Sequence, residues 1–235
     1  MKEKIQHRVI DSANTINNAL NNNELVIFEG AQASQLDIDF GTYPYVTSSS
    51  PSVAGVISGS GVSHKHINKV VGIVKAYSTR VGNGPFITEL NDATGEQIRA
   101  EGNEFGSTTG RPRRCGYLDL MVVKDSVIKN GIDNLVITKL DVLSKLEEIK
   151  ICIGYELNGK AIDYIPNTNI EFENTKAIYK SFKGWACDIS TTTQFNNLPQ
   201  EAQQYINFIQ SYLQCEIALV SVGPRRDQNI ILKEI

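Results

Sequence analysis

The sequence is poor in the features that mark several classes of protein. Its 235 residues carry 23 basic and 26 acidic side chains, so the formal net charge of −3 gives no global attraction to nucleic acid or to an anionic membrane. No apolar run approaches the ~20 residues that a membrane-spanning helix needs. Charged residues near Met1 are followed by no apolar segment, so no signal peptide is expected. Cysteine is scarce: the four are widely spaced and form no CxxC pair, which argues against a zinc site and favours free thiols in a reducing, cytoplasmic setting.

Short apolar runs alternate with helical patterns along the chain. This alternation predicts an α/β fold, with a mainly parallel central sheet flanked by helices in a single domain over residues 1–235. The pair Asn158-Gly159 is a hairpin signal between two strand-like runs and predicts a small antiparallel excursion near residues 149–185. The predicted strands are 25–28, 70–76, 135–137, 149–153 and 218–222, and the predicted helices are 5–20, 119–130 and 198–213.

The segment Gly102–Leu120, GNEFGSTTGRPRRCGYLDL, concentrates positive charge in a chain that is slightly acidic overall. Its arginines, Arg111, Arg113 and Arg114, lie within four residues. Guanidinium groups are fork-shaped and always charged, so they suit carboxylate and phosphate oxygens bound two at a time. The alternative interpretation is a solvated basic turn.

Two other segments favour a ligand site. Residues 28–50 form a polar loop after the predicted strand 25–28, and loops at the carboxyl ends of strands are where open α/β sheets bind ligands. The segment Leu135–Asp141, LVITKLD, places Lys139 and Asp141 at the end of another strand. A carboxylate there can accept from guanine N1–H and N2–H₂ together, while the lysine stem covers the base. A plain surface Lys–Asp pair is the alternative.

Two possible metal pairs are better explained otherwise. His64 and His66 are two residues apart, so on a helix they face different ways and are expected to face solvent. Asp37 and Asp39 are expected to accept N–H groups of their own loop rather than to hold a metal ion.

Taken together, these segments resemble the adenylosuccinate synthetase family from about Ile5 to the carboxyl terminus. The resemblance implies a GTP-dependent carbon–nitrogen ligase of purine and AMP biosynthesis, acting with Mg²⁺ as a cytoplasmic homodimer. GTP would phosphorylate the 6-oxygen of IMP, and the L-aspartate amine would then displace that phosphate. The matching runs are FEGAQ (Phe28–Gln32), DIDFGTYPYVTSS (Asp37–Ser49), KAYSTRVGNGPFITEL (Lys75–Leu90), GNEFGSTTGRPRRCGYLD (Gly102–Asp119), TKLDVL (Thr138–Leu143) and SVGPRRDQNIIL (Ser221–Leu232).

The resemblance also implies roles for individual residues, carried over position by position. The residues implied to bind IMP are Gln32, Thr47, Val81 and Arg111. Those implied to bind aspartate are Ser107, Thr108, Thr109, Gly110, Arg111, Pro112 and Arg113. Those implied to bind GTP are Arg113, Lys139, Leu140, Asp141, Ser221, Val222 and Gly223.

Two features of the family have no counterpart in this sequence: a Gly-rich phosphate-binding loop with an aspartate, and a histidine-bearing segment after it. The chain is therefore expected to be a carboxyl-terminal portion that lacks the general base, the acid and the Mg²⁺ ligands, with no metal site of its own. It is predicted to be inactive alone, as a fragment, a truncated gene product or half of a split enzyme whose amino-terminal half acts in trans. The alternative is a non-catalytic purine-nucleotide-binding or interaction module. An RNA-binding role is disfavoured, because the arginines have no interleaved aromatic residues.

Overall fold

The computed structural model describes residues 2–106 and 110–235, and the backbone contacts of the chain divide it into two compact units, Met1–Val70 and Val71–Ile235. No helix in these described ranges is long and apolar enough to cross a membrane. All four cysteines are free thiols, as predicted. The prediction of one domain over residues 1–235 stays a prediction.

In the first unit, the prediction of one continuous helix over residues 5–20 is wrong. Two shorter pieces replace it, and Val9 between them is extended. The second piece starts afresh because the Asp11 side chain accepts from the backbone N–H of Asn14 at 3.0 Å, which satisfies a donor that a new helix leaves open. The helical elements of this unit are α1 (Lys2–Ile5), η1 (Gln6–Arg8), α2 (Ser12–Asn21), η2 (Ser34–Leu36), α3 (Val53–Ser60) and η3 (His64–His66).

The strand predicted at residues 25–28 does not form. Leu25 and Ile27 are 88% and 79% exposed, and the segment belongs to no helix or strand. A strand needs a neighbour to receive its backbone hydrogen bonds, and within the described residues this segment has none. An apolar run predicts burial, but the partner that buries it has to be present.

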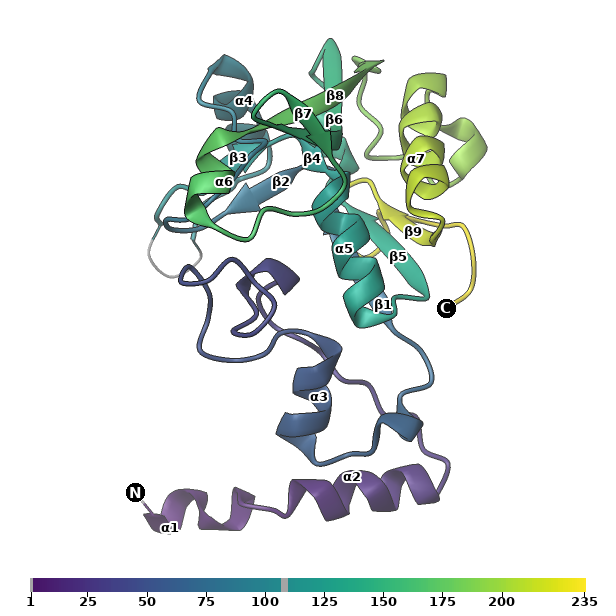
Figure 1. Ribbon diagram of the computed structural model, residues 1–235. Coiled ribbons are helices and arrows are strands. Elements are labelled where there is room, and N and C mark those ends of the chain that lie inside the picture. Colours follow the sequence, from purple (N-terminus) through teal and green to yellow (C-terminus); the bar gives the residue numbers. More distant parts are fainter. Residues whose placement is uncertain (1, 107–109) are drawn as a thin grey trace. The chain divides into compact units, whose positions relative to one another are not determined.

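The second unit is built on a mostly parallel sheet, as predicted. Its strand order is β1-β5-β9-β10, with β1 parallel to β5, β5 parallel to β9, and β10 antiparallel to β9. Helices α5 and α7 lie beside this sheet (Figure 1). They contribute Leu120, Ala202, Tyr205 and Ile209 to the same core as the sheet residues. The elements are β1 (Val71–Lys75), α5 (Leu120–Asn130), β5 (Asn134–Thr138), η4 (Leu140–Leu143), η5 (Phe195–Asn197), α7 (Gln200–Leu213), β9 (Glu216–Ser221) and β10 (Asn229–Ile231).

The predicted antiparallel excursion is confirmed. β6 (Glu148–Leu157) pairs antiparallel with β7 (Lys160–Ile162) and with β8 (Thr175–Lys183). Asn158 and Gly159 join β6 to β7 with φ of 52° and 78°, the pair of positive φ angles that a tight hairpin turn requires. The run 149–153 was expected in the parallel sheet, but its only parallel partner among the described residues is β4 (Leu118–Asp119). The other elements are β2 (Ser78–Arg80), α4 (Ala93–Glu101), β3 (Arg114–Gly116) and α6 (Asn169–Asn174).

Candidate functional site

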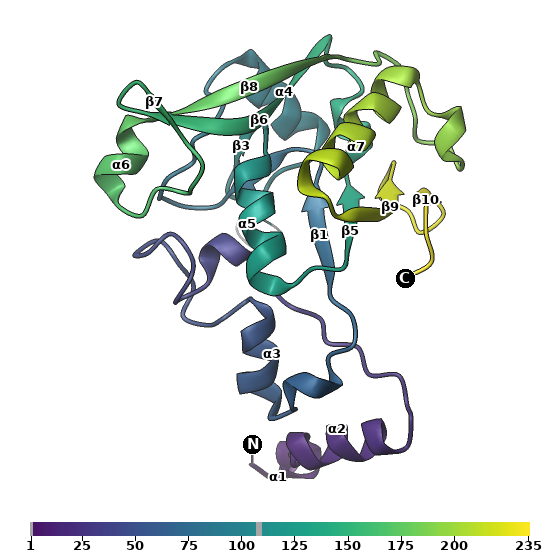
Figure 2. The same cartoon turned by 45° about the vertical axis from the view of Figure 1, so that its right-hand side comes forward.

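Three parallel strands end at the same edge of the main sheet. Register pairs Lys75 of β1 with Thr138 of β5, and Ile137 of β5 with Val220 of β9, so the residues after these positions lie together. Figure 2 shows the arrows of β1, β5 and β9 pointing the same way. Carboxyl ends of parallel strands are the usual ligand-binding edge of an open α/β sheet. This edge holds Lys75, Lys139 and the segment 221–223.

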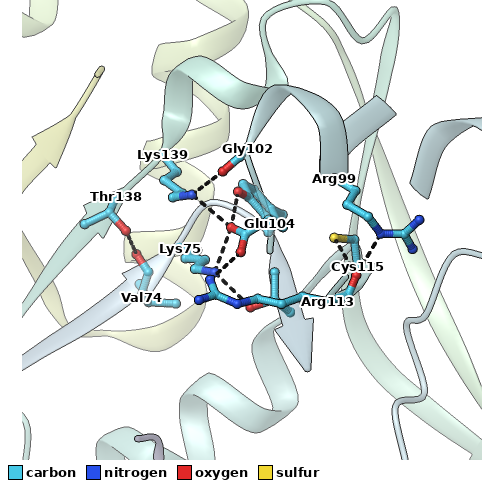
Figure 3. Close-up of polar contacts among 11 residues, drawn as sticks. Val74, Lys75, Arg99, Gly102, Glu104, Arg113, Cys115, Thr138 and Lys139 are labelled. Atoms are coloured by element: carbon cyan, nitrogen blue, oxygen red, sulfur yellow. Dashed lines mark hydrogen bonds and ion pairs between the residues drawn. The ribbon is translucent and has the colours of Figure 1, made fainter. Parts of the chain in front are cut away.

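A buried carboxylate organises this edge. Glu104 is fully buried, and both of its oxygens accept hydrogen bonds (Figure 3). Oε1 accepts from Lys75 Nζ at 2.8 Å, from Tyr77 Oη at 2.6 Å and from Lys139 Nζ at 3.0 Å, and Oε2 accepts from Arg113 Nη1 at 2.6 Å. These five residues are the Glu104 cluster. It contains three cations and one carboxylate, so positive charge is in excess.

The charges of the cluster shift one another's pKa values. Burial raises the pKa of Glu104, but hydrogen bonds from Lys75, Tyr77 and Lys139 outweigh burial and hold it at about 2, below the usual 4.5. Burial lowers the pKa of Lys75; the bond to Glu104 raises it, and the charges of Lys139 and Arg113 lower it further. Glu104 is therefore ionised at neutral pH, and the arrangement is one of charged partners.

Because the pKa of Glu104 is lowered in the folded protein, the free energy of unfolding should decrease at acid pH. Because the folded-state pKa lies below the unfolded value, this contribution is complete above pH 4.5 and is lost as the pH falls toward 2. Between pH 4.5 and pH 3 the free energy of unfolding should fall by about 2 kcal/mol more in the wild type than in Glu104→Gln, at about 1.36 kcal/mol per pKa unit. Urea unfolding at pH 6, 4.5 and 3, followed by circular dichroism, measures the difference. Parallel pH profiles for the two proteins would contradict it.

The arginine-rich segment separates into three different environments. Arg111 is exposed, at one end of a turn that the Gly106 N–H closes by donating to the Arg111 carbonyl at 2.8 Å. Arg113 belongs to the Glu104 cluster, and its backbone carbonyl accepts from Arg99 Nε at 2.8 Å. The turn also contains exposed Gly110, with φ of 64°, and exposed Pro112. Ser107, Thr108 and Thr109, predicted to bind aspartate, lie outside the described residues.

Arg114 is a structural arginine. It forms a two-bonded ion pair with Glu89, with Nε–Oε1 at 2.6 Å and Nη2–Oε2 at 2.5 Å, and its Nη1 donates to the carbonyls of Gly82 and Gly84. These bonds fix the turn next to Val81, which is itself exposed. The basic segment is thus neither wholly a ligand site nor merely a solvated turn.

Lys139 and Asp141 follow β5 as predicted. Lys139 has a left-handed backbone, with φ of 61°, and its Nζ also donates to the Gly102 carbonyl at 2.5 Å. The Oδ1 atom of Asp141 is buried and has no hydrogen-bond partner among the described residues. Burial raises the pKa of Asp141, and a bond from its own backbone N–H and the charge of Lys139 offset this in part. A buried carboxylate oxygen without a donor is costly, so a ligand N–H would stabilise it.

The remaining residues predicted to bind GTP are more enclosed. Leu140 and Val222 have fully buried side chains in the core, so only their backbones are available to a ligand. Ser221 Oγ donates to the Gly223 carbonyl at 2.8 Å, and the Val222 N–H donates to the Gln228 carbonyl at 2.9 Å. A Cβ at Gly223 would meet the amide end of the Gln228 side chain at 2.4 Å, so a larger residue there would have to displace that side chain.

The first unit carries the other two residues predicted to bind IMP. Gln32 is exposed with φ of 60°, and Thr47 is half-buried with its N–H donating to the Leu36 carbonyl at 2.8 Å. The loop around Thr47 is held by buried Asp37, whose carboxylate accepts from four donors: Ser50 Oγ (2.5 Å) and the backbone N–H groups of Asp39 (2.9 Å), Phe40 (3.2 Å) and Ser52 (3.3 Å). Burial raises the pKa of Asp37, but these bonds outweigh it and hold the pKa well below its usual range. The prediction that Asp37 accepts loop N–H groups is confirmed.

Sequence reasoning did not single out Glu104, Lys75 or Tyr77. Glu104 is 29 residues from Lys75 and 35 from Lys139, so no local spacing brings these residues together. The available signal was a lysine at the end of each of two neighbouring predicted strands, with an acidic residue in the arginine-rich segment to balance them. The predicted solvent exposure of His64 and His66 is confirmed.

A mostly parallel sheet with cationic side chains at the ends of its strands defines an open α/β protein with an anion-attracting edge. The adenylosuccinate synthetase family model matches residues 1–230. An adenylosuccinate synthetase of Fusobacterium nucleatum is 50% identical over 99% of this chain and 55% of its own length. One of Pelobacter propionicus is 51% identical over 98% of this chain and 54% of its own. This chain belongs to the adenylosuccinate synthetase family.

Solved structures agree with this assignment. The structure of fully ligated adenylosuccinate synthetase from Plasmodium falciparum is 46% identical, with a TM-score of 0.96 over 98% of this chain and 55% of that one. The chain therefore spans about half the length of the relatives it matches.

Proposed function

We propose that this chain is the carboxyl-terminal part of an adenylosuccinate synthetase, which joins IMP and L-aspartate at the expense of GTP through 6-phosphoryl-IMP. Membership of the family supports the reaction, and the coverage of about half of each relative supports a partial chain. The complete enzyme would be a cytoplasmic homodimer, formed with the amino-terminal half in the same chain or in trans.

The observation that carries the proposal is the buried Oδ1 of Asp141, which has no hydrogen-bond partner among the described residues and sits two residues beyond Lys139. Guanine offers N1–H and N2–H₂ side by side, which a carboxylate can accept together. Adenine presents an N1 acceptor there, and two acceptors facing each other repel. We assign Lys139, Leu140, Asp141 and Ser221–Gly223 to the guanine nucleotide, with Arg113 toward its phosphates.

The other substrates would use the remaining residues. Gln32, Thr47 and Val81 are assigned to IMP, and the segment 107–113 to the aspartate carboxylates, with Arg111 shared between the two. The chemistry needs three anionic partners held in line and charge stabilised at the purine 6-oxygen, which is mainly positioning and electrostatics. Among residues 2–106 and 110–235, no group of three or more His, Cys, Asp or Glu side chains is arranged to hold a metal ion, so no residue here is assigned to Mg²⁺.

The guanine assignment is tested by calorimetric titration of the chain with GDP and with ADP. We expect GDP to bind at least about tenfold more tightly, since each hydrogen bond to a charged group contributes roughly 1.5–3 kcal/mol. Equal affinity for the two nucleotides, or no binding of either, would contradict the assignment.

Arg111→Leu should weaken aspartate capture in the complete enzyme by about one to two decades, because a hydrogen bond to a charged carboxylate is lost. Thermal stability should hardly change, since Arg111 is exposed. Steady-state kinetics with varied aspartate and a melting curve measure the two effects. Lys160→Leu, which removes an exposed positive charge from β7, is the control. An unchanged aspartate KM and kcat would remove Arg111 from the aspartate site.

A further inference from the structure

Glu104 itself is closed to a ligand by burial. Oε1 accepts three hydrogen bonds and Oε2 accepts one at 2.6 Å, while its side chain is 0% exposed. Any effect of Glu104 on a bound molecule must therefore pass through the residues that it holds.

The residues it holds are partly open to solvent and have donors to spare. The side chains of Lys75, Lys139 and Arg113 are 26%, 36% and 29% exposed. An ammonium has three N–H donors and a guanidinium five. Lys75 uses two, on Glu104 and Thr79, and Lys139 uses two, on Glu104 and Gly102. Within residues 2–106 and 110–235, each lysine therefore has a third donor left for a ligand.

The three cations come from separate parts of the chain. Lys75 ends β1, Lys139 follows β5, and Arg113 closes the arginine-rich turn just before β3. Without a shared anion, three positive charges this close would repel one another. Buried charged groups are also seldom the most stable choice, since apolar residues of similar volume often do as well. The Glu104 cluster is therefore better explained by the placement of its cations than by stability.

We propose that Glu104 is a positioning residue of the nucleotide site, and that by fixing Lys139, Arg113 and Lys75 it builds a receptor for the anionic part of a guanine nucleotide, with Lys75 as a third binding cation. This inference rests on the proposed function, which assigns Lys139 and Arg113 to that nucleotide. It adds Glu104 and Lys75 to that site. It also means that the affinity for the nucleotide depends more on the fixed positions of the cations than on their net charge.

Glu104→Gln separates geometry from charge. The amide keeps the shape and one acceptor, but its NH₂ faces either Arg113 or the two lysines, so one side of the cluster loses its partner. The net charge of the cluster rises from +2 to +3, which by charge alone would tighten the binding of an anion. Loss of positioning instead predicts binding weaker by roughly 10- to 100-fold. The two explanations thus predict opposite signs.

The experiment is calorimetric titration of the 235-residue chain with GDP and, separately, with pyrophosphate. Stoichiometry reports the folded fraction and the dissociation constant reports the site, so a variant that merely folds poorly lowers the first and leaves the second unchanged. Lys75→Met should weaken both ligands about tenfold. Glu104→Asp, which restores the carboxylate on a shorter stem, should recover part of the loss. Glu101→Gln is the matched control, because Glu101 pairs with Lys145 outside the cluster.

The outcomes distinguish this inference from the proposed function. Weaker binding of both ligands by Glu104→Gln, with Glu101→Gln unchanged, supports the positioning role. Unchanged or tighter binding by Glu104→Gln overturns that role and leaves the guanine assignment intact. If the chain binds pyrophosphate but does not prefer GDP to ADP, the guanine assignment fails, and Glu104→Gln still decides the positioning role with pyrophosphate. If neither pyrophosphate nor GDP binds, both are overturned.

Discussion

The 235-residue chain alone is expected to form no adenylosuccinate above background, and the part of the Fusobacterium nucleatum relative that this chain does not cover, supplied in trans, is expected to restore turnover. That relative is matched over only 55% of its length. Phosphoryl transfer from GTP depends on neutralising and orienting a triphosphate. Glu104 cancels one of the three positive charges of its cluster, and Arg111 is assigned to IMP and aspartate, so too little positive charge remains to neutralise a triphosphate.

Absorbance-monitored formation of adenylosuccinate from IMP, GTP and aspartate measures this result, with aspartate omitted as the control.

The exposed apolar surface of the chain gives a second measurement. In the first unit Leu25 and Ile27 are exposed, and in the second Ile73 is 68% exposed on β1, an edge strand of its sheet. Exposed apolar segments and open strand edges attract partners. Binding of a hydrophobic dye to the chain should fall when the missing part of the enzyme is added in trans. Robust turnover by the chain alone would contradict the proposal.

The features that sequence could predict are those with local signals. Asn158-Gly159 specified its hairpin because both positions need a positive φ, and Asp119 specified the start of α5 by accepting from the Met121 N–H at 3.1 Å. The apolar runs of β5 and β9 were found because inner strands of a parallel sheet are buried on both faces, and β1 was found by a similar run although its Ile73 is exposed. Lys139 and Asp141 were then placed correctly at the end of β5.

The features that sequence could not predict depend on distant partners. The run 25–28 looks like the run of β5, but only the latter has neighbours on both sides among the described residues. Arg113 and Arg114 are adjacent and chemically identical. Because successive side chains near a strand point to opposite faces, one meets Glu104 and the other meets Glu89. Which arginine serves a ligand and which serves the fold is decided by residues far away in the sequence.

Asp141→Asn is expected to have the second-largest effect, by changing which nucleotide the complete enzyme uses. Its carboxylate would accept two guanine N–H groups, and an asparagine amide can offer only one acceptor and places a donor against the other. With roughly one to two decades for each hydrogen bond to a charged group, kcat/KM for GTP should fall by about a hundredfold or more. Xanthosine triphosphate has an oxygen at position 2, which accepts from the new amide, so its use should rise.

In Asp141→Asn the thermal stability should not fall together with the use of GTP. Burial raises the pKa of Asp141, and its Oδ1 has no hydrogen-bond partner among the described residues, so the ionised carboxylate is a cost to the free protein. Replacing it with a neutral amide should leave the melting temperature unchanged or higher while GTP use falls, as expected where a site gives up stability for binding. Asp163→Asn, an exposed acid after β7, is the control and should change neither quantity. Competition kinetics with GTP and xanthosine triphosphate, together with thermal melts, measure both effects. A carboxylate that binds guanine cannot be neutralised without weakening the use of GTP. Unaltered GTP kinetics in Asp141→Asn would therefore show that Lys139–Asp141 is only a turn at the end of a strand.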